Sequence, residues 1–89
     1  MTRLTQNPEI VAREIDDTVF LVGTGNDAVF HLNAIGAAIW KLLAQPVSVP
    51  EMTQPLIDAF PDIPAEQVRN DVERLFSDLD ARGFLVRID

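Results

Sequence analysis

Hydrophobic and polar residues in the first third of the chain follow the pattern of short β-strands. Three runs rich in β-branched and aromatic residues predict strands at residues 9–15 (EIVAREI), 18–22 (TVFLV) and 27–32 (DAVFHL). Asp16-Asp17 separates the first two runs, and Gly23-Thr24-Gly25-Asn26 separates the last two. Because both connections are short and made of turn-forming residues, the pattern predicts an antiparallel meander.

Alternation along the third run divides its side chains between the two faces of the predicted sheet. The more apolar set, which we expect on the core side, comprises Ala28, Phe30 and Leu32. The opposite set comprises Asp27, Val29 and His31. A bare three-stranded sheet of this size is only marginally stable, so helices are expected to cover one of its faces.

A first helix is predicted at residues 34–44. Asn33 is a favourable N-cap immediately before it, and Gln45-Pro46 ends it. Its apolar stripe at helical spacing consists of Ile35, Ile39, Leu42 and Leu43. Trp40 lies beside this stripe, and we expect it to be part of the core.

Two further helices follow. Ser48-Val49-Pro50-Glu51 matches a capping box at the start of the second helix, in which Pro55 lies about one turn from the N-terminus. Its apolar residues are Met52, Leu56, Ile57 and Phe60. The third helix, at residues 65–82, has the clearest periodicity, and Gly83 supplies its C′ position. Its apolar stripe consists of Val68, Val72, Leu75, Phe76 and Leu79.

Residues 84–88 (FLVRI) predict a final strand or extended tail. The fold class is therefore α+β: a three-stranded antiparallel β-sheet followed by a three-helix winged-helix-like unit with a short C-terminal strand. The 89 residues fit one domain spanning residues 1–89, in which residues 1–8 are expected to be flexible.

Composition and charge exclude several classes of function. The chain contains no cysteine, which excludes disulfides, thiolate metal sites and cysteine nucleophiles. Its net charge of −7 opposes binding to the phosphate backbone of nucleic acids. No apolar run approaches the roughly 18–20 residues that span a bilayer, and the first ten residues lack the apolar segment of a secretory signal. We expect a cytoplasmic protein that binds neither nucleic acid nor membrane and carries no cofactor.

Few side chains are candidates for catalysis or for binding a metal or cofactor, and each of them has a structural explanation. His31 is the single histidine and has no second His or Cys with which to ligate a metal, so no metal site is expected. Gly23-Thr24-Gly25 opens no helix, and a hairpin turn is favoured over a phosphate-binding loop. Ser48 could carry the prosthetic arm of a carrier protein, but its capping role accounts for it. The acidic residues between 58 and 80 favour a solvated face, with a basic peptide or partner enzyme as the alternative.

The order of motifs resembles that of the PqqD-like proteins. Ala28-Val29-Phe30-His31-Leu32-Asn33, continued by Ala37-Ala38-Ile39-Trp40, resembles the family signature "v-x-L-N-x-x-A-x-x-I-W". Asn70-Asp71-Val72-Glu73-Arg74-Leu75-Phe76, with Leu79 and Gly83-Phe84-Leu85, resembles its closing block. The similarity, which includes Asn7-Pro8 and Arg13, covers roughly residues 7–86. Val22-Gly23-Thr24-Gly25 lacks the Pro-Glu-Gly of the member dedicated to pyrroloquinoline quinone (PQQ) biosynthesis, which leaves the natural-product pathway open.

The resemblance implies a non-catalytic peptide chaperone, also called a RiPP recognition element. Such proteins bind the leader of a ribosomally made precursor peptide and present it to a modifying enzyme, either a radical-SAM protein or a leader peptidase. In the family the leader adds as a strand beside the third strand, in the cleft against the third helix. No residue of the chain is assigned a catalytic role.

Carried over to this chain, the resemblance implies a peptide-binding site on one strand and one helix. The strand residues are Asp27, Val29, Phe30 and His31, and the helix residues are Val68, Asp71, Val72, Leu75 and Asp78. The Asp71 flank of the helix is preferred to the flank of Arg69 and Glu73, because Asp71 fills the family's Asp-Val position. A winged-helix DNA-binding regulator and a non-catalytic enzyme subunit are the alternatives, and the exposed strand edge leaves a homodimer open.

Overall fold

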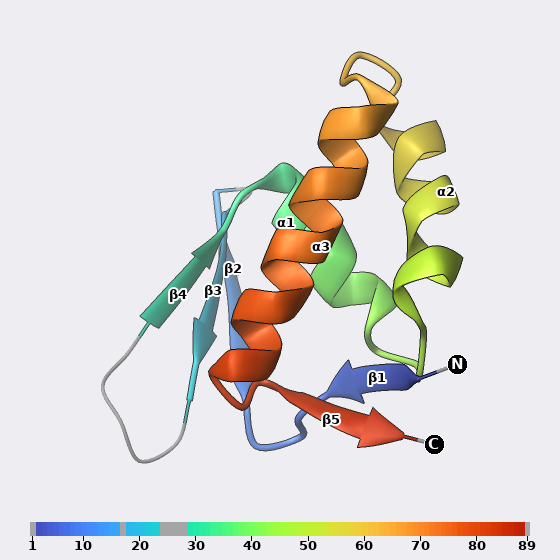
Figure 1. Cartoon of the computed structure of the whole chain (residues 1–89). Helices are drawn as coiled ribbons and strands as arrows, with labels where there is room; N and C mark the ends of the chain where they lie inside the picture. The colour runs from blue at the N-terminus through green and yellow to red at the C-terminus, as the bar shows by residue number, and fades with distance from the viewer. Residues whose placement is uncertain (1, 17, 24–28, 89) are drawn as a thin grey trace.

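The computed structural model describes residues 2–16, 18–23 and 29–88. Its elements in chain order are β1 (Arg3–Gln6), β2 (Val11–Ile15), β3 (Thr18–Val22), β4 (Val29–Leu32), α1 (Ala34–Leu42), α2 (Val49–Ala59), α3 (Ala65–Ala81) and β5 (Leu85–Ile88). Figure 1 shows the sheet of β2, β3 and β4 on one side of the three helices, and the β1–β5 ribbon at the C-terminal end of α3. This arrangement confirms the predicted α+β class. No helix within the described ranges has the length and apolar character needed to cross a membrane.

The meander has the predicted topology. The strand order is β2-β3-β4 with both pairs antiparallel, and β4 lies at one edge. β3 has the predicted bounds, and β2 begins two residues later than expected. Leu32 is buried and Phe30 is half-buried against the core, which confirms that these two side chains face the helices. Asp27 and Ala28 lie outside the described residues.

The first helix begins as predicted and ends two residues early. The side chain of Asn33 accepts a hydrogen bond from the backbone N–H of Gly36 at 2.9 Å, which satisfies one of the free amides at the helix start. Trp40 is buried, as expected, whereas Leu42 is exposed. The expectation for Leu42 was wrong because the buried face is centred on Ile39 and extends towards Trp40, which leaves Leu42 at its margin.

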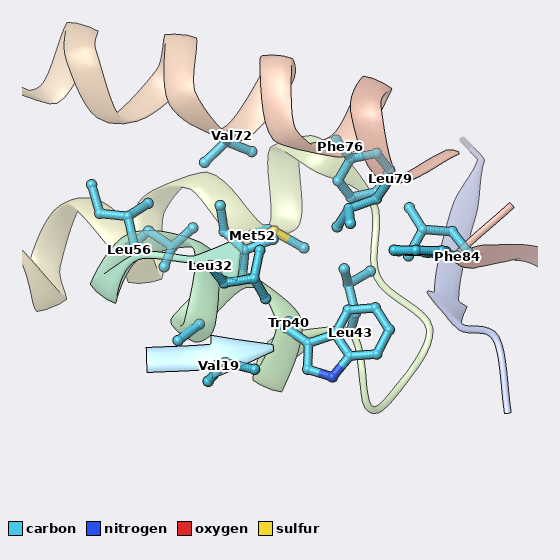
Figure 2. Close-up of a cluster of buried hydrophobic side chains, with 14 of the residues drawn as sticks. Val19, Leu32, Trp40, Leu43, Met52, Leu56, Val72, Phe76, Leu79 and Phe84 are labelled. Atoms are coloured by element: carbon cyan, nitrogen blue, oxygen red, sulfur yellow. The ribbon is translucent and has the colours of Figure 1, made fainter. Parts of the chain in front are cut away.

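The second and third helices confirm the sequence analysis. Ser48 and Glu51 form both hydrogen bonds of the capping box, and Pro55 lies inside α2. Gly83, with a φ of +76°, follows the C-terminus of α3 in the left-handed conformation that glycine adopts without strain. The core lies between these helices and the sheet. In Figure 2 the side chains that meet there include Val19, Leu32, Met52, Leu56, Val72, Phe76 and Leu79.

The N-terminal strand differs from the expectation that residues 1–8 are flexible. β1 pairs antiparallel with β5, and the backbones of Leu4 and Val47 exchange two hydrogen bonds of 2.9 Å. The side chain of Gln6 donates to the backbone oxygen of Trp40 at 2.6 Å. The segment Arg3–Gln6 contains one apolar residue, Leu4, and its main partner lies at the opposite end of the chain. No local pattern could therefore indicate this strand.

Candidate functional site

An open groove of about 490 Å³ runs between the edge strand β4 and the helix α3, with α1 at its base. The end of β4 and the cap of α1 contribute Phe30, His31, Leu32 and Asn33. The helix α1 contributes Ile35, Gly36 and Ile39. The wall formed by α3 consists of Gln67, Asp71, Arg74, Leu75 and Asp78. The groove therefore combines an apolar base with one polar wall.

The rotation of α3 about its axis follows from its core residues. Val68, Val72 and Leu79 are fully buried, which fixes one side of the helix against the core. Because successive helical residues differ by about 100°, the residue preceding each of these lies at the margin of the buried side. Those residues are Gln67, Asp71 and Asp78, and all three line the groove. The flank that carries Glu73 instead borders a smaller hollow near β1 and β5.

The edge of β4 that borders the groove has no strand partner within the described part of the chain. β4 is hydrogen-bonded to β3 on its other side, through a register in which Leu21 faces Phe30 and Val19 faces Leu32. Every second residue of such an edge strand presents an unpaired N–H and C=O. The four residues of β4 include neither proline nor lysine, the residues that commonly protect a sheet edge from further pairing.

Charges on the helical wall are mixed. Asp71 accepts a hydrogen bond from the guanidinium of Arg74 at 2.6 Å, one turn further along α3. The side chain of Arg74 is largely exposed and that of Asp71 is half-buried, so the pair contributes at most about 1 kcal/mol to stability. Asp78 adds a second carboxylate to the same wall. The wall can accept hydrogen bonds from a ligand and carries a small excess of negative charge.

An aromatic contact joins β4 to the C-terminal end of α3. The ring of Phe30 meets the ring of Phe84 edge to face, with centroids 6.2 Å apart. The guanidinium carbon of Arg82 lies 4.7 Å from the centroid of Phe30 on the ring face, within the range of a cation–π interaction. These contacts tie the strand to the helix and so maintain the spacing of the two walls.

Only some of the residues that the sequence analysis assigned to the site line the groove in the structure. Five of them line the groove: Phe30, His31, Asp71, Leu75 and Asp78. Val68 and Val72 do not line the groove, because both side chains are fully buried in the core and offer no surface to a ligand in this structure. Val29 lies on the opposite face of β4 and is 53% exposed, and Asp27 lies outside the described residues.

Several lining residues were missed. Gln67 and Arg74 flank the predicted positions on α3 at helical spacing, and the helical pattern around Asp71 could have indicated them. Asn33, Gly36 and Ile39 also line the groove. They do so because the start of α1 packs beside α3, and the spacing of residues in the sequence does not predict that packing. Among the described residues, no group of three or more His, Asp or Glu side chains is arranged to hold a metal ion.

Comparison with known proteins places the chain in a family. The protein-family model described as "Coenzyme PQQ synthesis protein D (PqqD)" matches residues 18–85, about three quarters of the chain. One similar solved structure is described as "TbiB1 in Complex with the TbiA(beta) Leader Peptide". It has a TM-score of 0.75 and 23% sequence identity, and the match covers 91% of this chain and 93% of that chain. A search of curated proteins found no match. The shared fold and the extent of the family match confirm the resemblance noted in the sequence, and the chain belongs to the PqqD family.

Proposed function

We propose that this protein is a non-catalytic adaptor that binds the leader segment of a ribosomally synthesised precursor peptide in the groove between β4 and α3. It then presents the peptide to a modifying enzyme, a radical-SAM enzyme or a leader peptidase, in the cytoplasm. The observation that carries the proposal is the edge of β4, which has no strand partner among the described residues and lies beside an open groove of about 490 Å³. The leader complex of the structural neighbour TbiB1 supports the same class of ligand.

The leader would add to β4 as a fourth strand of the sheet. Such strand addition takes its affinity from main-chain hydrogen bonds and its specificity from pockets that accept alternate side chains. With the leader on the edge of β4, every second side chain would point towards α3. Phe30 and Leu75 supply apolar contacts on that side, and Asp71 and Asp78 supply acceptors.

Fluorescence polarisation of a labelled leader tests this proposal. The leader would be taken from the precursor gene encoded beside the gene for this protein, and we expect saturable binding at micromolar or tighter affinity. N-methylation of the peptide backbone, one residue at a time, should weaken binding at every second position, because alternate N–H groups of an added strand face β4. Absence of binding, or sensitivity to N-methylation without a period of two, would contradict strand addition.

A matched pair of variants tests the location of the groove. Leu75→Ala removes an apolar side chain from the α3 wall, whereas Leu42→Ala makes the same change at an exposed position of α1 outside the groove. Truncation at a contact residue of an interface commonly costs more than about 1 kcal/mol. We therefore expect Leu75→Ala to weaken leader binding roughly 5- to 20-fold and Leu42→Ala to leave it within twofold. Equal effects of the two variants would place the leader elsewhere.

A further inference from the structure

The face of the β2-β3-β4 sheet that points away from the helices carries an exposed apolar surface. The register aligns Val11, Val22 and Val29 in one row across the three strands. A second row contains Arg13, Phe20 and His31, and a third pairs Ile15 with Thr18. These eight residues form the outer sheet face. Five of its eight side chains are apolar, and Val11, Ile15 and Val29 are between 50% and 58% exposed.

This pattern differs from that of a sheet with one face in water. Such sheets alternate apolar residues towards the core with polar residues towards solvent. In β2 the order is reversed. Val11 and Ile15 point outwards, whereas Ala12 and Glu14 are aligned with the inward-facing Leu21 and Val19 of β3. β2 is therefore patterned to bury its outer side, although all five of its residues are exposed in the isolated chain.

The charge of the outer sheet face indicates what can cover it. Arg13 is its cation, and none of its eight residues is acidic, in a protein whose net charge is −7. Buried charges require an opposite charge or hydrogen-bonding partners. None of these eight residues would supply a carboxylate for Arg13 if a second copy packed face to face. The surface that complements these eight residues is therefore apolar, carries a carboxylate opposite Arg13, and differs from the outer sheet face itself.

The outer sheet face is continuous with the leader groove. On β4, Phe30 and Leu32 face the helices, while Val29 and His31 belong to the outer sheet face. His31 borders the groove as well, but its ring packs edge to face against Phe20 on the outer side. A leader strand added to the free edge of β4 would extend both faces, since its side chains alternate between them. A protein docked on the outer sheet face would then contact the leader without entering the groove.

We propose that the outer sheet face is the docking surface for the enzyme that modifies the leader, through an apolar patch of that enzyme with a carboxylate that pairs with Arg13. This inference rests on the proposed function. It adds that the two faces of β4 have different roles. One face helps to form the groove that holds the leader, and the other binds the modifying enzyme. Large apolar patches with a polar rim commonly mark protein–protein interfaces.

The test uses the full chain, the purified modifying enzyme encoded beside the precursor gene, and the labelled leader. Arg13→Glu reverses the charge of the outer sheet face and Ile15→Lys adds a charge to its apolar part. Arg69→Glu makes the same charge reversal at an exposed position on α3, outside both the groove and the outer sheet face. Circular dichroism would verify that all three variants fold. We expect Arg13→Glu and Ile15→Lys each to weaken enzyme binding at least tenfold, with leader affinity within twofold of wild type. Arg69→Glu should change neither.

Three outcomes would overturn the inference: enzyme affinity unchanged in both outer-face variants, leader affinity falling in parallel with enzyme affinity, or no enzyme binding by the wild-type chain. A fourth outcome would also overturn it: the wild type sediments as a dimer and the Ile15→Lys variant as a monomer. In that case a second copy, and not the enzyme, would occupy the outer sheet face. Failure of the proposed function has a different signature. The wild type would not bind the leader, whereas its affinity for the enzyme would still depend on Arg13.

Discussion

Replacement of Leu4 by alanine is expected to destabilise the whole domain, although this residue lies close to the N-terminus. Leu4 is 5% exposed and belongs to the main core, and its backbone joins β1 to Val47. Leu4→Ala removes the equivalent of three buried methylene-sized groups, each worth about 0.8 kcal/mol. The expected loss in the free energy of unfolding is therefore about 2–3 kcal/mol, towards the lower end of the range for buried Leu→Ala changes, because a terminal strand can relax into the space.

Urea denaturation followed by circular dichroism would measure this loss. For a domain of this size, about 1 kcal/mol corresponds to a Tm change of roughly 4–8 °C, so a fall of about 10–20 °C is expected. Leu42→Ala, at a position of α1 that is 37% exposed, should cost less than about 1 kcal/mol. A loss below about 0.5 kcal/mol for Leu4→Ala would refute the reasoning. It would mean that β1 is detached in solution and that residues 1–8 are flexible, as the sequence suggested.

Two further predictions concern local contacts. Hydrogen bonding from the Arg3 guanidinium lowers the pKa of Glu51 from 4.5 to about 2, so its ionised form stabilises the folded state above pH 4.5, and that stabilisation is lost as the pH falls towards 2. Glu51→Gln, which keeps an acceptor for the backbone of Ser48, should therefore lower the Tm at pH 7, and the difference should shrink in melts at pH 2. Gly36→Ala should lower the free energy of unfolding by about 1 kcal/mol, because the new Cβ would lie 3.1–3.2 Å from Leu32 and the resulting strain outweighs the gain in helix propensity. A more stable Gly36→Ala protein in urea denaturation would contradict this balance.

The predictable part of the fold consists of features encoded within a few neighbouring residues. The β-branched and aromatic run at residues 18–22, the Asn33 cap, the capping box of Ser48 and the stripe of α3 each depend on local sequence, and the structure reproduces all of them. The family motifs are likewise local strings in a fixed order. For that reason the resemblance could be recognised from the sequence and was confirmed by the family match.

Features that depend on contacts between distant segments could not be predicted in this way. The pairing of β1 with β5 joins the two ends of the chain through a segment with one apolar residue, so no periodicity reveals it. The choice between Asp71, which lines the groove, and Val72, one residue later and fully buried, depends on how α3 is rotated against the core. The outward direction of Val11 and Ile15 also became visible only with the register of β2 on β3. Sequence determined the elements and the family because their signals are short-range, whereas the groove and the outer sheet face arise from packing between elements far apart in the chain.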